Sequence, residues 1–306
     1  MKILSDISII PAYNCEKTIS YIIPIFNAEK TIKETIYSVY SQLNKNDELI
    51  LVNDGSTDGT ENILTEFAKD NIFIINQKNH GVSYSRNIGA QKSTGDIIAF
   101  LDSDDILNHE IVDKVKDCFK ENKDINWAFG YYNISCMNQI STIRDNNISL
   151  GIHDSIFELY NNFDDKTSNE LLSTCSLYFS RTSFLKCGGF DESMISGEDT
   201  FLWLKFGLNN PKIYYLNTLS FTYNKEDAII ERNTHKIRSK NETSRILNGI
   251  ELIKKTKPYN HLSLSVVNVW LYRHLKFCIR TFNYKKIIVL LKLKFLILKI
   301  KFNKWI

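Results

Sequence analysis

Three carboxylates fall within four residues at the end of an apolar run. In GDIIAFLDSDDI (95–106), Asp102, Asp104 and Asp105 come directly after IIAFL. Carboxylates crowded at the tip of a buried strand repel one another unless a cation holds them. Mg²⁺ or Mn²⁺, completed by water and phosphate oxygens, is the natural counter-ion for such a set. The alternative is a solvated acidic turn ahead of a helix that Asn108 caps.

Two further polar clusters follow apolar runs. Asp54 stands at the end of ILVND in ILVNDGSTDGT (50–60), where its carboxylate could accept hydrogen bonds from a base or a ribose. The alternative there is an Asx-type turn that caps the next helix. Arg86 lies in NHGVSYSRNIGA (79–90), within a short predicted helix. A guanidinium suits bidentate contact with phosphate. The alternative is a surface arginine on an amphipathic helix, which would give the same sequence pattern.

A fourth cluster opens a predicted helix. Glu198 and Asp199 begin the apolar stretch EDTFLWL within GGFDESMISGEDTFLWLKFG (188–207). The helix N-terminus stabilises both side chains as anions, and an ionised carboxylate that faces a cleft can act as a general base. Simple helix capping is the alternative.

The elements that must position these clusters are apolar strands alternating with amphipathic helices. The strands are predicted at YIIPIF, ELILV, IFII, DIIAFL and WAFGYY, all within residues 21–132. The clearest helix is 108–122, whose apolar residues recur at helical spacing. This alternation predicts an α/β fold with a mixed, mostly parallel sheet and helices on both faces. Such sheets bind ligands at the carboxyl ends of their strands, where the polar clusters fall.

The N-terminus contains a tandem repeat. IIPAYNCEKTI (9–19) recurs as IIPIFNAEKTI (22–32). If the first copy were the first strand, Pro24 would fall inside the following helix, at a cost of about 3 kcal/mol or more. The second copy is therefore predicted to form the strand, with a helix over 28–43, and the extra copy a peripheral extension. The expected domains are an extension at 1–21, a catalytic domain at 22–234 and a basic helical region at 235–306.

Net charge differs sharply between residues 1–234 and the C-terminal tail, residues 235–306. From His235 onward there are 17 Lys and Arg against 2 Asp and Glu, a net charge of +15, while the preceding 234 residues hold the other 21 basic and 33 acidic residues, a net charge of −12. The six cysteines form no CxxC pair, which favours free thiols in a reducing cytosol over a disulfide framework or a zinc site. No uncharged apolar run approaches the roughly 20 residues of a membrane-spanning helix.

The tail ends in NYKKIIVLLKLKFLILKIKFNKWI (283–306). Lysines that interrupt apolar residues predict attachment to an anionic membrane surface, at the inner face of the cell membrane. An ordinary helical subdomain packed on the catalytic core is the alternative. Nucleic-acid binding is disfavoured, because the tail carries no known motif and is too apolar to line a solvated groove.

Taken together, the clusters resemble the family 2 glycosyltransferases, which have the GT-A fold. The matching segments occur in the family's order over roughly residues 20–225: IIPIFNAEKTIKETIYSVYSQ, ELILVNDGSTDGT, NHGVSYSRNIGA, GDIIAFLDSDD and GGFDESMISGEDTFLWL. The resemblance implies transfer of a sugar from a nucleotide-sugar donor, with inversion, to a hydroxyl of a glycan or lipid-linked acceptor in bacterial surface polysaccharide synthesis. The repeated start has no counterpart in the family.

The resemblance also implies roles for individual residues. Pro24 and Asn27 would border the nucleotide pocket, with Asp54 on the base, expected to be uracil, and Arg86 near the nucleotide or diphosphate. The metal pair would be Asp102 and Asp104, with Asp102 also on the donor and Asp105 beside them.

In the Glu-Asp motif, Asp199 would be the catalytic base, with Glu198 next to it. The chemistry is consistent, since a divalent cation stabilises the charge on a departing nucleoside diphosphate.

Two other hypotheses compete with this one. The chain could be an inactive relative that serves as a membrane-bound assembly partner. A nucleotidyltransferase would need a Gly-rich phosphate loop with Lys or Arg near the N-terminus, and this sequence has none.

Overall fold

The computed structural model describes residues 16–136, 139–144, 146–156, 172–194 and 197–224, together with Leu291, Lys292 and Lys294. The strands are β1 (Ile19–Ile25), β2 (Glu48–Asp54), β3 (Ile72–Gln77), β4 (Ile97–Phe100), β5 (Ile106–Leu107), β6 (Trp127–Cys136), β7 (Gln139–Ile143), β8 (Gly151–His153), β9 (Leu177–Ser180) and β10 (Ile213–Asn224). The helices are α1 (Ile32–Tyr40), α2 (Thr60–Thr65), α3 (Val82–Lys92), α4 (Ile111–Glu121), α6 (Arg181–Cys187) and α7 (Glu198–Asn209), with a 3₁₀ turn, η1 (Thr174–Ser176).

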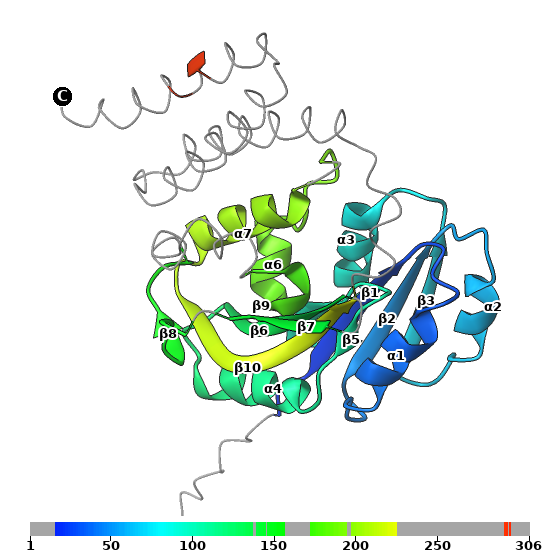
Figure 1. Cartoon of the computed structure of the whole chain (residues 1–306), viewed down its shortest axis with the longest axis horizontal. Helices are drawn as coiled ribbons and strands as arrows, with labels where there is room; N and C mark the ends of the chain where they lie inside the picture. Colours follow the sequence, from blue (N-terminus) through cyan, green and yellow to red (C-terminus); the bar gives the residue numbers. More distant parts are fainter. Residues whose placement is uncertain are drawn as a thin grey trace, which may run out of the picture.

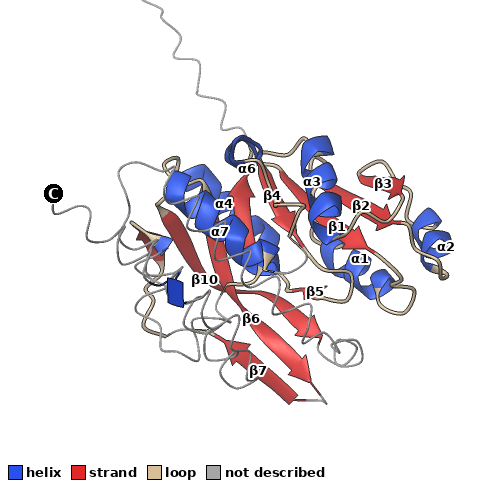
Figure 2. Cartoon of the chain, turned by 90° about the horizontal axis from the view of Figure 1, so that it is seen from above, coloured by secondary structure: helices blue, strands red, loops and turns tan. Residues whose placement is uncertain are grey.

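The strands form one mixed, largely parallel sheet in the order β3-β2-β1-β4-β9-β6-β10-β5 (Figures 1 and 2). The β3, β2, β1 and β4 strands run parallel to their neighbours. Antiparallel pairing begins at β9, which lies between β4 and β6. The β7 strand extends β6 as a hairpin, and β8 pairs with β10. The carboxyl ends of β1, β2 and β4 therefore meet at one edge of the sheet.

Helices cover both faces of the sheet, as the sequence predicts. In Figure 1, α3, α6 and α7 lie above the sheet, while α1 and α4 lie below it. One buried core joins the upper helices to strand residues such as Phe100 and Phe179. The other joins α1, α2 and α4 to the opposite strand faces, with Ile36 and Val115 among its members. The central strands, such as β1, β2 and β4, thus carry apolar residues on both sides, which explains their continuous apolar sequences.

The second copy of the repeat forms β1, which confirms that prediction. Its segment pairs with β2 on one side and with β4 on the other. The strand begins at Ile19, three residues before the boundary predicted at 21/22, and Ser20 and Tyr21 are already fully buried. Most of the first copy, at 9–15, lies outside the described residues.

Two details of the helices differ from the sequence prediction. Asn108 does not cap α4, because 106–107 pair with β10 as β5 and the backbone N–H of Asn108 donates to Ser220 O. The helix begins only at Ile111, with Glu110 in the left-handed region (φ 66°) as its N-cap. The helix predicted over 28–43 is shorter, since Ala28–Thr31 form a turn ahead of α1.

The helices predicted at 235–306 lie outside the described residues, apart from Leu291, Lys292 and Lys294. Across the described part of the chain, no helix has both the length and the apolar character needed to cross a membrane.

Candidate active site

A cavity of about 360 Å³ opens at the carboxyl edge of the parallel strands. It is lined by Pro24, Ile25, Phe26, Asp54, Val82, Ser85, Arg86, Asp102, Ser103, Asp104 and Glu198. Six of the residues singled out in the sequence are in this set: Pro24, Asp54, Arg86, Asp102, Asp104 and Glu198. They come from β1, β2, α3, the loop after β4, and α7, so only the fold brings them together.

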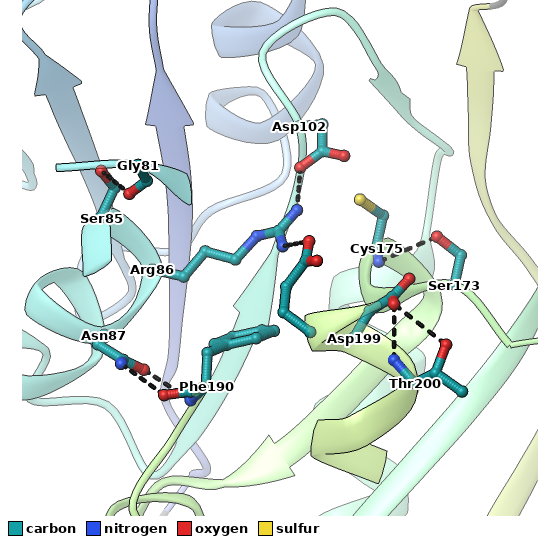
Figure 3. A network of polar contacts seen from close by, with 11 residues as sticks. Gly81, Ser85, Arg86, Asn87, Asp102, Ser173, Cys175, Phe190, Asp199 and Thr200 are labelled. Carbon is teal, nitrogen blue, oxygen red and sulfur yellow. Dashed lines mark hydrogen bonds and ion pairs between the residues drawn. The ribbon is translucent and has the colours of Figure 1, made fainter. Parts of the chain in front are cut away.

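Arg86 lies at the centre of the polar network (Figure 3). Its Nη2 donates to Asp102 Oδ1 at 2.6 Å, and its Nη1 is 3.7 Å from Glu198 Oε1. The guanidinium also sits over the ring of Phe190, 5.2 Å from the centroid. Arg86 is only 5% exposed, so the alternative of a surface arginine is wrong.

Burial and neighbouring charges set the electrostatics of this network. Burial alone would lower the pKa of Arg86, but Asp102 first, and Cys175 and Glu198 after it, hold the pKa above its usual value. Burial raises the pKa of Glu198, and Asp199 raises it further, while Arg86 opposes both. The Nε and Nη1 atoms of Arg86 make no hydrogen bond to any part of the chain that the structure describes. A buried cation with free donors is suited to receive an anionic ligand.

The acidic loop after β4 is partly buried. Asp105 is 1% exposed, and burial, together with Asp102 and Asp104, raises its pKa to about 9. Among the described residues, one cluster could supply three ligand atoms to a metal ion: Asp102, Asp105 and Cys175, with those atoms within 4.8 Å of one another. This cluster pairs Asp102 with Asp105, whereas the sequence pointed to Asp102 and Asp104. Asp104 lines the cavity instead.

Asp54 reaches from the end of β2 to the start of α3. Its Oδ1 accepts from Gln77 Nε2 at 2.7 Å and from His80 N at 2.8 Å, and its Oδ2 accepts from Gly81 N at 2.8 Å. Gly81 is the N-cap of α3 and has a φ of 92°, a conformation that favours glycine. The carboxylate therefore holds the start of α3, not of α2 as the Asx-turn alternative had it. It still faces the cavity, so contact with a base stays a prediction.

Asn27 directly follows Phe26, which lines the cavity, but it is not itself among the described lining residues. It adopts a left-handed φ of 50°, which asparagine tolerates. Its Oδ1 accepts from Thr57 N at 2.8 Å, and its N–H donates to Ser56 Oγ at 3.0 Å. Asn27 thus ties the end of β1 to the loop after β2.

The two acidic residues of the Glu-Asp motif differ in their surroundings. Glu198 lines the cavity and faces Arg86. Asp199 is not among the lining residues, and its Oδ1 accepts from the backbone N–H of Thr200 at 2.6 Å (Figure 3). Both begin α7, whose N-terminus favours the anionic form of a carboxyl, but for Glu198 burial and Asp199 outweigh this effect.

Three residues of the network were not singled out in the sequence. The Asn87 amide clamps the loop before α7, since its Oδ1 accepts from Phe190 N at 2.8 Å and its Nδ2 donates to Phe190 O at 3.0 Å. This clamp places the Phe190 ring against Arg86. Asn87 and Phe190 fall within quoted segments, but 103 residues separate them. Cys175 lies in STCS (173–176), where no motif draws attention to it.

The fold and the site together define a class of protein. A GT-A-type α/β sheet carries an aspartate-rich pocket with a buried arginine at its carboxyl edge. The family described as Glycosyl transferase family 2 matches residues 20–186, more than half of the chain. The chain therefore belongs to glycosyl transferase family 2.

Curated relatives agree with this assignment. The glycosyltransferase GlyA of Streptococcus pneumoniae is 30% identical over 228 residues, which are 70% of this chain and 30% of GlyA. A Bacillus subtilis protein named for teichuronic acid biosynthesis, the glycosyltransferase TuaG, is 30% identical over 135 residues, 43% of this chain and 52% of TuaG. The chain spans between 24% and 30% of the lengths of GlyA and of uncharacterised glycosyltransferases from two Rickettsia species.

Solved structures share the fold. S. aureus TarS 1–349 in complex with UDP-GlcNAc has a TM-score of 0.66 at 18% identity, covering 85% of this chain and 73% of that one. The mannosyltransferase PcManGT from Pyrobaculum calidifontis, in complex with GDP-Man and Mn²⁺, has a TM-score of 0.54 at 15% identity, covering 87% and 76%.

Proposed function

We propose that this chain is an inverting, metal-dependent glycosyltransferase that moves a sugar from a nucleotide-sugar donor, UDP-linked in the first instance, to a hydroxyl group. The observation that carries the proposal is that Arg86, Asp102, Asp104 and Glu198 all line the same cavity. The TarS complexes with UDP and UDP-GlcNAc support a donor of this kind.

The nucleotide would lie along the edge formed by β1 and β2. Pro24 and Asp54 line this part of the cavity, and Asn27 holds the two strand ends together. The diphosphate would lie toward Arg86, whose free donors suit phosphate oxygens. Because Arg86 is already held by Asp102 and backed by Phe190, little side-chain entropy remains to be lost on binding.

The acidic residues fit a divalent cation such as Mg²⁺ or Mn²⁺. Asp102, with Asp105 behind it and Asp104 on the cavity wall, would hold the ion through carboxylate oxygens. When bound, the ion would stabilise the negative charge that develops on the departing nucleoside diphosphate. Burial and the neighbouring carboxylates of Asp102 and Asp104 raise the pKa of Asp105, and a bound cation would offset the repulsion among these three carboxylates.

Asp199 is our proposed general base. Glu198 is engaged by Arg86, and its raised pKa makes it the weaker candidate for a permanently ionised group. Asp199 lies one residue along, at the N-terminus of α7, where the helix favours the anion. It would take the proton of the acceptor hydroxyl as that oxygen attacks the sugar from the side opposite the leaving group, which inverts the anomeric carbon.

We further propose a glycan or lipid-linked acceptor in surface polysaccharide synthesis, reached from the cytoplasmic side of the membrane. The name of TuaG supports this setting. The net charge of +15 from residue 235 onward supports peripheral contact with anionic lipid through that region. Sedimentation with phosphatidylglycerol vesicles at low salt tests the contact, and a protein that stays in the supernatant would contradict it.

Calorimetric titration of UDP, with and without Mn²⁺, tests the donor site. We expect Mn²⁺-dependent binding that weakens at least about tenfold in Asp102→Asn, because a metal ligand is lost. The exposed Asp113→Asn on α4 is the matched control and should bind as the wild type does. Hydrolysis or transfer from a panel of UDP-sugars then follows.

The same titration separates the proposal from an inactive assembly partner. Binding of UDP, GDP or dTDP in the presence of Mn²⁺ supports an intact donor site. Failure of all three nucleotides to bind would favour the inactive relative.

A further inference from the structure

We propose that Asn87 is a positioning residue for the transfer reaction, because the Phe190 ring that it holds sets the orientation of the Arg86 guanidinium. Asn87 then acts on the diphosphate of the donor through Arg86, without contact of its own. The inference deepens the proposed function and rests on its assignment of Arg86 to the diphosphate. It gives a purpose to a contact between residues 103 positions apart in the chain.

The two carboxylates beside Arg86 do not by themselves fix its guanidinium. One hydrogen bond, from Nη2 to Asp102 Oδ1, holds a single corner of the fork. Glu198 Oε1 lies 3.7 Å from Nη1, and Nη1 and Nε have no hydrogen-bond partner among the described residues. A planar group held at one corner can still tilt about that contact. A further constraint is therefore needed to aim its free donors at an anionic ligand.

The Phe190 ring supplies that constraint. Its centroid lies 5.2 Å from Arg86 Cζ, within the range of a cation–π contact. The ring is only 2% exposed and meets Phe100 of β4 edge-on, with 5.2 Å between centroids and 82° between ring planes. Phe184 of α6 lies on another side, at 5.9 Å. The ring is thus wedged between the sheet and α6, and the loop that carries it decides where its face lies.

Asn87 fixes this loop through the backbone of Phe190 (Figure 3). Its Oδ1 accepts from Phe190 N at 2.8 Å, while its Nδ2 donates to Phe190 O at 3.0 Å and to Glu192 Oε1 at 2.8 Å. A Cβ added to Gly189 would lie 2.3 Å from Asn87 Oδ1, and Gly189 has a φ of 57°. The loop therefore reaches the amide only with glycine at this position.

The same loop is held from α7. Lys205 Nζ donates to the carbonyl oxygens of Gly188 and Gly189. Because α7 begins with Glu198 and Asp199, the loop joins the helix that carries Arg86 to the helix that carries the two acids. Loss of the Asn87 amide would release the loop from the α3 side only.

A purely structural role for Asn87 is the competing explanation. In that case Asn87 would stabilise the loop, and Arg86 would keep its orientation through Asp102 and Glu198 alone. Either role lowers the free energy of unfolding when the amide is removed, so stability does not separate them. Coupling between Asn87 and Arg86 in ligand binding does, because only a residue that acts through Arg86 loses its effect when Arg86 is changed.

A double-mutant cycle tests the inference by calorimetry in the presence of Mn²⁺, with the nucleoside diphosphate that the wild type binds, UDP in the first instance. We expect Asn87→Ala to weaken binding about tenfold. In the Arg86→Lys background the same change should cost less than about twofold, because an ammonium has no planar fork to orient. Gln91→Ala is the matched control and should bind as the wild type does, since Gln91 is exposed one turn further along α3.

Phe190→Leu provides a second cycle, because leucine leaves the backbone contacts with Asn87 in place and removes only the ring face. It should weaken binding about fivefold in the wild-type background and less than about twofold in the Arg86→Lys background. Equal losses in both backgrounds, or no loss in either, would overturn the inference and leave the proposed function standing. A wild-type protein that binds none of UDP, GDP and dTDP would overturn the proposed function, and this inference with it.

Discussion

At the scale of single residues, the site is organised by one buried cation between two carboxylates. Arg86 contacts Asp102 on one side and Glu198 on the other, and Phe190 covers its guanidinium. Lysine could not replace it, because an ammonium lacks the planar fork that reaches two partners at once. The cation therefore links the acidic loop after β4 to the N-terminus of α7.

The two acids of the Glu-Asp motif should behave differently when each is neutralised. In Asp199→Asn, we expect kcat to fall by about 10²-fold or more, because proton removal from the acceptor is lost, with UDP affinity within about threefold of the wild type. In Glu198→Gln, by contrast, we expect UDP affinity itself to change, because Arg86 loses an ion-pair partner. Steady-state kinetics and calorimetry on both variants separate the roles. The reverse pattern would make Glu198 the base.

The raised pKa of Glu198 predicts how stability depends on pH. The unfolded chain releases this proton near the ordinary pKa of 4.5, whereas the folded protein holds it to higher pH. The contribution of Glu198 to the free energy of unfolding is thus complete below pH 4.5 and is lost as the pH rises through the raised pKa. Glu198→Gln removes this dependence, so the variant should gain stability relative to the wild type as the pH rises above 4.5.

Urea unfolding of the metal-free protein across a pH series measures this difference. The exposed Glu34→Gln on α1 is the control. A difference between Glu198→Gln and the wild type that stays constant with pH would contradict the prediction.

At the scale of elements, the placement of α3 decides the geometry of the site, because α3 carries Arg86 and Asn87. Its N-terminus is tied to β2 through Asp54, and Gln77 at the end of β3 joins the same carboxylate. Its body packs closely on β1, where a Cβ added to Gly89 would meet Ile22 Cγ2. Strand ends and helix therefore hold one another in place.

Asp54→Asn tests this link. An amide can keep the contacts through its oxygen but places its NH₂ against a backbone donor, so we expect a loss of about 1–3 kcal/mol in the free energy of unfolding. UDP affinity should fall too, through displacement of Arg86 and loss of contact with the base. Chemical denaturation and UDP calorimetry measure the two effects. Unchanged stability would show that the Asp54 hydrogen bonds do not hold α3.

At the scale of the whole molecule, the repeated start is accommodated by using its second copy in the central sheet. Ser20 and Tyr21 precede that copy and are fully buried, and Ser20 Oγ bonds Glu48. Removal of residues 8–19 joins Ile7 to Ser20 and preserves the strand sequence ISYIIPI. Removal of 9–21 instead puts Ser8 at the place of Tyr21 and Ile7 at the place of Ser20.

The two deletions should therefore differ. Removal of 9–21 should cost about 3–5 kcal/mol, as expected for loss of a buried aromatic side chain. Removal of 8–19 should cost less than about 1 kcal/mol, because it affects mainly exposed contacts such as Lys17 with Asp96. Thermal unfolding of the two shortened proteins in parallel measures the difference in stability. Equal stability of the two would show that Tyr21 is not part of the essential core.

The sequence by itself determined the fold class, the use of the second copy in the sheet, and the loops in which the candidate site residues lie. These follow from local patterns. Apolar runs of strand length, helical periodicity and the position of Pro24 can each be recognised within a short stretch of sequence. The family resemblance added the order of the segments.

Only the tertiary structure decided which of these residues meet. The link from Arg86 to Glu198, the clamp from Asn87 to Phe190 and the proximity of Cys175 to Asp102 all join residues more than 70 positions apart. Asn108 failed as a helix cap for the same reason, since its backbone joins Ser220 on a distant strand. Such contacts depend on strand register and on packing across the sheet, which no local pattern specifies.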